Sequence, residues 1–178
     1  MRKHRYGVGF LCVMLAAVFA VGNFSAFAQE STMAEPEDER VNVVEFMALG
    51  NLDLEPYQGK AVFLNFFYEG CYFCMAEMPD IKKIFDAYSR DDLQIILIHA
   101  WYGEDERNTK SVISKHGLEE LTFFEDEGMK LSRLIPVQYF PTSLFIDQEG
   151  YLVEYLFGAL SFEEMAEIVE NMGVSRVE

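Results

Sequence analysis

A nearly continuous apolar segment, residues 61–67, is followed after a three-residue gap by a Cys-x-x-Cys pair, Cys71 and Cys74. An apolar run of strand length is typical of a central strand that is buried on both faces of a sheet. Beyond the cysteines, apolar residues recur every three or four positions, which predicts a helix with one apolar face over residues 71–89. The pair is therefore expected at a strand-to-helix junction within an α/β fold.

The rest of the chain repeats this alternation. Further strands are predicted at 41–46, 93–98 and 121–124, and further helices at 108–116, 129–135 and 161–172. Residues 143–146 and 151–157 flank an Asp-Gln-Glu-Gly turn and predict a hairpin, while Ser161 and Glu164 form a capping box. Parallel crossovers followed by an antiparallel pair predict one mixed central β-sheet flanked by helices, in a single domain over 41–178.

The first 28 residues have the three-part plan of a secretory signal peptide. Arg2, Lys3 and Arg5 make a positive start, no charge follows until Glu30, and small residues at 26–28 suit cleavage. The alternative is an uncleaved membrane anchor, because a membrane span needs only about 20 apolar residues. Either way the chain is expected outside the cytoplasm, in the periplasm or the cell envelope.

Charge restricts the partners of the exported chain. The full sequence has 14 basic and 30 acidic residues, a net charge of -16, and cleavage would remove three basic residues and no acidic ones. Such a chain should avoid nucleic acid and anionic membrane surfaces. Residues 29–40, between the signal peptide and the domain, are polar and acidic and are predicted to form a flexible leader.

The two cysteines that remain after cleavage favour redox chemistry, because a loop closed across two residues constrains little of the unfolded chain. At a helix N-terminus, unpaired N–H groups and the helix dipole stabilise a thiolate. We expect Cys71, the more exposed of the two, to attack a client disulfide, and Cys74 to resolve the mixed disulfide. Haem attachment would need His in place of Met75, and zinc a second ligand pair. No cofactor or metal is expected, although a metal-binding module is an alternative.

Two segments resemble the TlpA/ResA-type thioredoxin-like family of extracytoplasmic thiol–disulfide oxidoreductases. Residues 59–79 resemble its pattern GK, apolar run, NFW-x-x-W-C-x-x-C-x-x-E-x-P, and residues 140–150 resemble PT-x-apolar-ID-x-x-G. The match spans roughly residues 41–173. It implies a thioredoxin-like fold, in which Pro141 is a cis-proline facing the cysteines and the backbone of Phe140 and Thr142 pairs with the client.

The resemblance also implies roles near the cysteines. Glu77 matches an acidic residue of the family, and three residues beyond Cys74 it would accept the proton of that thiol and tune resolution. The alternative is a solvent-facing helix glutamate. Tyr72 and Phe73, between the cysteines, are expected to contact the client.

The chain departs from the family at Phe67 and Gly70, where the family has tryptophan. The loop 68–70 is therefore expected to bind different clients or to sit more loosely. No basic residue lies near the cysteines in the sequence, while Glu69 and Glu77 do, which argues for a reductant. We predict an oxidoreductase that reduces disulfides of exported proteins; the alternative is a disulfide-forming oxidase or isomerase. The resemblance adds cytochrome c maturation and a membrane-embedded reductase as electron donor.

Other polar residues are expected to have structural or solvated roles. His99 is predicted to be a strand-end residue, and His116 to stabilise a helix C-terminus. The acidic clusters 104–106 and 125–127 lack calcium-loop spacing and are predicted to be solvated loops.

Overall fold

The computed structural model describes residues 40–101 and 109–177. The predicted signal peptide, nearly all of the predicted leader and the acidic cluster 104–106 lie outside these residues. Within the two described ranges, no helix has the length and apolar character needed to cross a bilayer.

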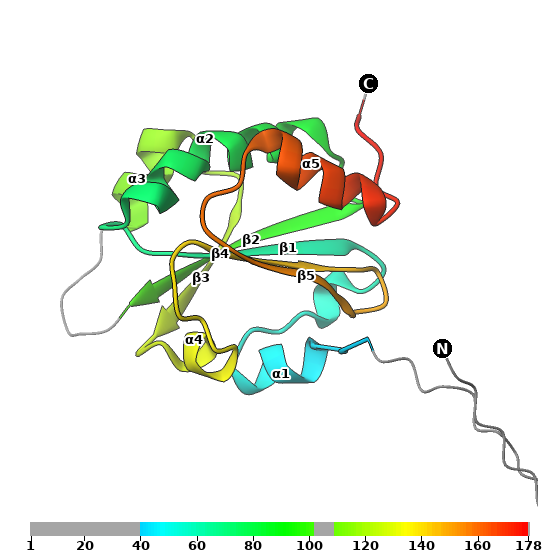
Figure 1. Cartoon of the computed structure of the whole chain (residues 1–178), viewed down its shortest axis with the longest axis horizontal. Coiled ribbons are helices and arrows are strands. Elements are labelled where there is room, and N and C mark those ends of the chain that lie inside the picture. Colours follow the sequence, from blue (N-terminus) through cyan, green and yellow to red (C-terminus); the bar gives the residue numbers. More distant parts are fainter. Residues whose placement is uncertain (1–39, 102–108, 178) are drawn as a thin grey trace, which may run out of the picture. The chain divides into compact units, whose positions relative to one another are not determined.

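A five-stranded sheet in the order β3-β2-β1-β4-β5 forms the middle layer of the fold (Figure 1). Its strands are β1 (Ala61–Phe67), β2 (Leu93–Trp101), β3 (Thr122–Glu127), β4 (Thr142–Ile146) and β5 (Leu152–Phe157). The first three strands pair in parallel, whereas β4 is antiparallel to both β1 and β5. All of β1 is buried at the centre of the sheet, as its apolar run predicts. The predicted mixed sheet is thereby confirmed.

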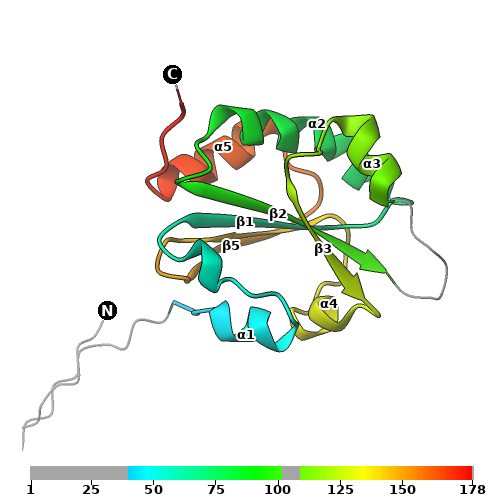
Figure 2. The same ribbon diagram turned by 180° about the vertical axis from the view of Figure 1, so that it is seen from behind.

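Helices cover both faces of this sheet (Figures 1 and 2). One face carries α2 (Tyr72–Ala87), α3 (Thr109–His116) and α5 (Phe162–Asn171); the other carries α1 (Val44–Leu49), the 3-10 turn η1 (Glu55–Tyr57) and α4 (Lys130–Leu134). Because side chains alternate along a strand, β1 supplies Phe63 and Phe67 to the layer under α2, and Leu64 to the opposite layer. The predicted capping box at the start of α5 is confirmed, with both of its hydrogen bonds present.

The predicted strand at 41–46 is wrong. Only Asn42 pairs there, in an isolated bridge with Tyr151, and the chain turns into α1 at Val44. The Asn42 side chain accepts a hydrogen bond from the Val44 N–H, and Met47 on α1 is fully buried. A local side-chain hydrogen bond and one buried anchor therefore outweigh the β-branched composition of this segment.

The predicted solvated loop at 125–127 is also wrong, since these residues complete β3. The carboxylate of Asp126 is buried and accepts hydrogen bonds from the N–H groups of Leu131 (2.7 Å) and Ser132 (2.8 Å) and from the Ser132 hydroxyl (2.6 Å). It thereby satisfies unpaired N–H groups in the first turn of α4. Asp126 has a structural role that its position in an acidic cluster concealed.

Candidate active site

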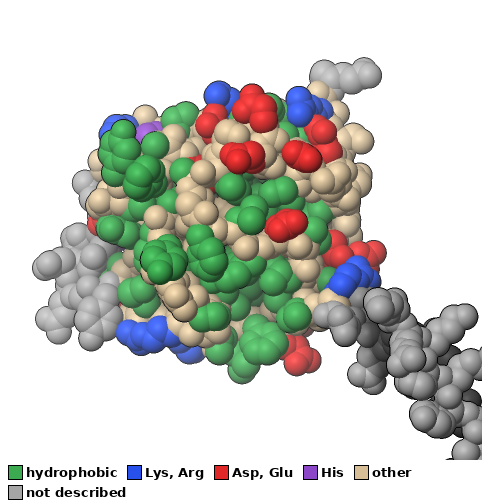
Figure 3. All heavy atoms as spheres, in the orientation of Figure 1, with side chains coloured by type: hydrophobic (Ala, Val, Ile, Leu, Met, Phe, Trp, Pro, Cys, Tyr) green, Lys and Arg blue, Asp and Glu red, His purple; other side chains and the backbone are tan. Residues whose placement is uncertain are grey.

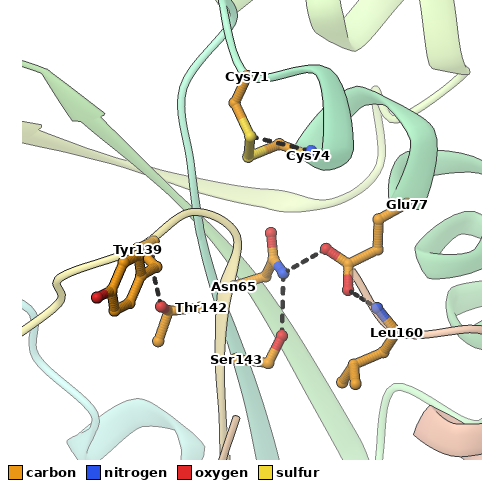
Figure 4. Close-up of a disulfide and its surroundings, with 8 residues drawn as sticks. All are labelled: Asn65, Cys71, Cys74, Glu77, Tyr139, Thr142, Ser143 and Leu160. Carbon is orange, nitrogen blue, oxygen red and sulfur yellow. Dashed lines mark hydrogen bonds between the residues drawn. A yellow bond between two sulfur atoms is a disulfide. The ribbon is translucent and has the colours of Figure 1, made fainter. Parts of the chain in front are cut away.

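Cys71 and Cys74 are joined by a disulfide at the N-terminus of α2 (Figure 4). Cys71 is the N-cap residue, and its sulfur accepts a hydrogen bond from the Cys74 N–H at 3.0 Å. Cys71 is 6% exposed and Cys74 is fully buried. The predicted strand-to-helix position is confirmed, and Cys71 is the more exposed sulfur of the two.

The bond between Phe140 and Pro141 is cis, as predicted. The Tyr68 ring packs edge-on against Phe140 at 5.3 Å, so the loop before Cys71 contacts the residue before the cis-proline. Thr142 starts β4 and is fully buried, and its hydroxyl donates to the Tyr139 carbonyl at 2.7 Å. Phe140 is half-buried, so part of its side chain is accessible at the surface. The Thr142 side chain is not accessible, and its hydrogen bond to Tyr139 stabilises the cis-proline loop.

Glu77 lies one helical turn beyond Cys74 and is 1% exposed, so the alternative of a solvent-facing glutamate is wrong. One carboxylate oxygen accepts a hydrogen bond from Asn65 Nδ2 (2.9 Å) and the other from the Leu160 N–H (2.8 Å). Burial raises the pKa of Glu77 from 4.5 to about 7, although these hydrogen bonds act in the opposite direction. A carboxyl group with this pKa can exchange a proton at neutral pH.

Asn65 joins three elements around this carboxylate. Its side-chain nitrogen also donates to Ser143 Oγ on β4, at 3.1 Å. In the sequence Asn65 is the polar residue within the apolar run 61–67, and the pattern assigns it no role in the site. Its contacts depend on how β1, α2 and β4 pack, which no local pattern encodes.

His99 was missed as a site residue. It lies within β2, is fully buried, and both of its ring nitrogens meet carboxylates: Nε2 lies 2.6 Å from Glu69, and Nδ1 lies 2.7 Å from Glu125. The Thr109 hydroxyl donates to Glu125 at 2.8 Å. Because Glu69 stands two residues before Cys71, these contacts anchor the loop 68–70 to the sheet. The loop 68–70, which has Gly70 where the family has tryptophan, is thus held by polar contacts.

Basic side chains do approach Cys71, but they come from α3. A hollow of about 530 Å³ beside Cys71 is lined in part by Lys115 and His116. The pKa of His116 is lowered by burial and by the charge of Lys115, which favours the neutral imidazole. Lys115, a residue distant in the sequence, therefore brings a permanent positive charge to the hollow beside Cys71.

Comparison with known proteins agrees with this geometry. The family model of the thioredoxin-like domain matches residues 54–173. This chain belongs to the thioredoxin-like domain family. Two relatives of this thioredoxin-like protein are named thiol–disulfide oxidoreductase ResA. The one from Halalkalibacterium halodurans is 26% identical over 83% of this chain and 82% of its own length. The one from Bacillus thuringiensis is 28% identical over 93% of this chain and 95% of its own length.

A solved structure shares the fold. It is the pneumococcal exposed lipoprotein thioredoxin from Streptococcus pneumoniae, which is 26% identical to the thioredoxin-like protein with a TM-score of 0.56, over 66% of this chain and 89% of the other. The resemblance to the TlpA/ResA group is confirmed by these matches. With its disulfide-bonded Cys-x-x-Cys pair, the thioredoxin-like protein is a thiol–disulfide oxidoreductase.

Proposed function

We propose that this thioredoxin-like protein reduces disulfides of exported proteins through the Cys71/Cys74 pair. The observation that carries the proposal is the buried Glu77 one turn beyond Cys74. It places an acidic group behind the inner sulfur. A negative charge there disfavours a thiolate at Cys74, and pairs with weakly stabilised thiolates are reductants more often than oxidants.

The reaction moves two electrons from the dithiol to the client. The Cys71 thiolate attacks one sulfur of the client disulfide, a mixed disulfide forms, and the other client sulfur leaves as a thiolate. Cys74 then loses its proton to Glu77 and attacks the Cys71 sulfur. The Cys71–Cys74 disulfide forms, and the second client sulfur leaves with its electron pair. Lys115, beside the Cys71 hollow, stabilises the attacking thiolate.

The client surface is aromatic. Tyr72 and Phe73 are 79% and 63% exposed beside Cys71, and Tyr139 and Phe157 are 64% and 52% exposed. The rings of Tyr139 and Phe157 meet edge-on at 5.8 Å, linking the cis-proline loop to β5. Figure 3 shows hydrophobic side chains gathered on the face that includes β5. We propose that apolar side chains flanking the client cysteine bind here, beside the half-buried Phe140, since exposed apolar area of this kind favours protein contact.

The proposed location is outside the cytoplasmic membrane, where residues 1–28 would direct the chain. The name of the pneumococcal relative, an exposed lipoprotein, supports a location at the cell surface or envelope. A reductase at that location needs an electron donor, for which we propose a membrane-embedded dithiol protein. Cytochrome c maturation is the client process that the TlpA/ResA resemblance suggests.

The reduction potential of the cysteine pair tests the proposal. Equilibration with glutathione buffers should give a value close to the roughly −270 mV of thioredoxin. A value near about −120 mV, which is typical of a strong oxidant, would overturn the reductase proposal in favour of a disulfide-forming oxidase.

A further inference from the structure

The amide oxygen of Asn65 is a buried acceptor that has no hydrogen-bond partner in the described part of the chain. Asn65 is fully buried, and its nitrogen donates to both Glu77 and Ser143. In Figure 4 the oxygen points away from these two partners, toward the side on which the disulfide lies. An unpaired buried acceptor costs about as much free energy as a lost hydrogen bond, so its position calls for an explanation.

The surroundings of this oxygen change with the redox state. Cys74 and Glu77 are three residues apart on α2, so their side chains share one face of the helix. In the disulfide form Cys74 has no proton to donate. Reduction creates a buried S–H group at Cys74, which is a weak hydrogen-bond donor. The unpaired oxygen of Asn65 is then the acceptor on the side of that thiol.

A carboxamide has a donor on one side and an acceptor on the other, and half a turn about its last bond exchanges them. With Glu77 ionised, Asn65 Nδ2 donates to the carboxylate and Oδ1 points toward the side of Cys74, which favours the thiol form of Cys74. With Glu77 protonated, its O–H donates to Oδ1, and the amide N–H faces the sulfur and favours the thiolate. The hydroxyl of Ser143 serves both orientations, because it can accept from Nδ2 or donate to Oδ1.

We propose that Asn65 is a positioning residue that couples the proton of Cys74 to that of Glu77 by turning its amide. The inference rests on the proposed role of Cys74 as the resolving thiol. In the coupled step the proton leaves Cys74 Sγ and Glu77 gains one on its carboxylate. No electrons move, and the total charge of the two groups is unchanged. The turned amide then stabilises the thiolate that attacks the mixed disulfide.

The groups facing Glu77 suit this coupling. Burial raises the pKa of Glu77 to about 7, the hydrogen bonds from Leu160 and Asn65 lower it, and the charge of Asp80 on the same helix raises it. From β1, β4 and the segment before α5, the facing groups are uncharged: the amide of Asn65 with the Ser143 hydroxyl behind it, and the Leu160 N–H. Both protonation states of Glu77 are therefore populated near neutral pH, and so are both amide orientations.

The test uses the full chain with Cys12→Ser and Cys71→Ser, in which Cys74 is the one thiol. Its thiolate is titrated by ultraviolet absorbance, with and without Glu77→Gln, in the Asn65 and Asn65→Leu backgrounds. The N–H of the new glutamine holds the amide in its thiolate-stabilising orientation. We expect Glu77→Gln to raise the ratio of thiolate to thiol about tenfold when Asn65 is present. In the Asn65→Leu background only the loss of the Glu77 charge acts, so we expect Glu77→Gln to raise this ratio about threefold or less. An equal effect in both backgrounds would overturn the coupling.

Nuclear magnetic resonance of the reduced chain with native cysteines gives a second measurement that needs no Asn65 variant. The side-chain N–H protons of Asn65 should lie close to the Cys74 β-protons when Glu77 is protonated, and close to the Glu77 side chain when it is ionised. An orientation that stays the same as Glu77 titrates would contradict the proposal. Neither measurement involves a client. An oxidising potential would therefore overturn the reductase proposal alone, and a failed coupling would leave that proposal standing.

Discussion

Nε2 of His99 lies 2.6 Å from a carboxylate oxygen of Glu69, and this contact fastens the loop before Cys71 to β2. The other ring nitrogen meets Glu125 on β3 at 2.7 Å. The buried ring is thus held between two acidic side chains next to the redox site.

Removing the imidazole should release this loop. We expect His99→Asn to lower the free energy of unfolding of the oxidised protein by about 1–3 kcal/mol, because two carboxylates lose a buried partner. Urea denaturation measures the loss. His116→Asn is the matched control: the Nε2 atom of His116 is buried with no hydrogen-bond partner in the described ranges, so its replacement should cost little. Equal losses in the two variants would contradict a special role for His99.

Glu77 should make stability depend on pH in the direction opposite to most carboxylates. Its folded pKa of about 7 lies above its ordinary value of 4.5, so the folded protein holds a proton that the unfolded chain has released. The contribution of Glu77 to the free energy of unfolding should therefore fall by about 3 kcal/mol as the pH rises from about 4.5 to 7, and then level off.

Urea denaturation of the oxidised protein between about pH 4 and 8 checks this prediction. In Glu77→Gln the contribution should be absent, and the variant should gain stability relative to the wild type as the pH rises. Glu167→Gln, on the exposed side of α5, should keep the wild-type profile. A profile shared by Glu77→Gln and the wild type would show that Glu77 does not hold the proton.

The roles of the two cysteines can be separated by trapping. We expect Cys74→Ala to accumulate mixed disulfides with client proteins, because the Cys71 adduct is no longer resolved. These adducts should appear on non-reducing gels and be identifiable by mass spectrometry. In a Cys12→Ser background, Cys71→Ala should accumulate few or none, because Cys74 is buried. Adducts that form on Cys71→Ala instead would reverse the proposed assignment.

The aromatic client surface predicts selectivity. We expect Tyr139→Ser combined with Phe157→Ser to lower kcat/KM about tenfold for a disulfide peptide with apolar residues beside its cysteines, since aromatic contacts contribute about 0.5–1.5 kcal/mol each. The rate with hydroxyethyl disulfide should stay unchanged. Phe46→Ser is the control, because this exposed aromatic side chain lies on α1, an element that carries neither Tyr139 nor Phe157. A uniform loss for both disulfides would indicate damage to the redox centre.

The features predictable from sequence are those that depend on nearby residues. The apolar run of β1, the cysteines at the start of α2 and the Ser161 capping box follow from side-chain periodicity and from hydrogen bonds that span three or four residues. The cis bond before Pro141 was predictable for a different reason, namely a family motif that covers the whole turn. At residues 41–46 the local composition wrongly predicted a strand. The burial of Met47, which favours α1, depends on tertiary packing that the local sequence does not encode.

By itself, the sequence determined that a Cys-x-x-Cys pair begins a helix after a buried strand, and hence the class of chemistry. Only the tertiary structure decided which groups surround that pair. Asn65, Glu77 and Leu160 meet across intervals of 12 and 83 residues, and His99 meets Glu69 and Glu125 across 30 and 26. Such contacts depend on strand register and helix packing, which are set by the burial of the whole core rather than by any local pattern.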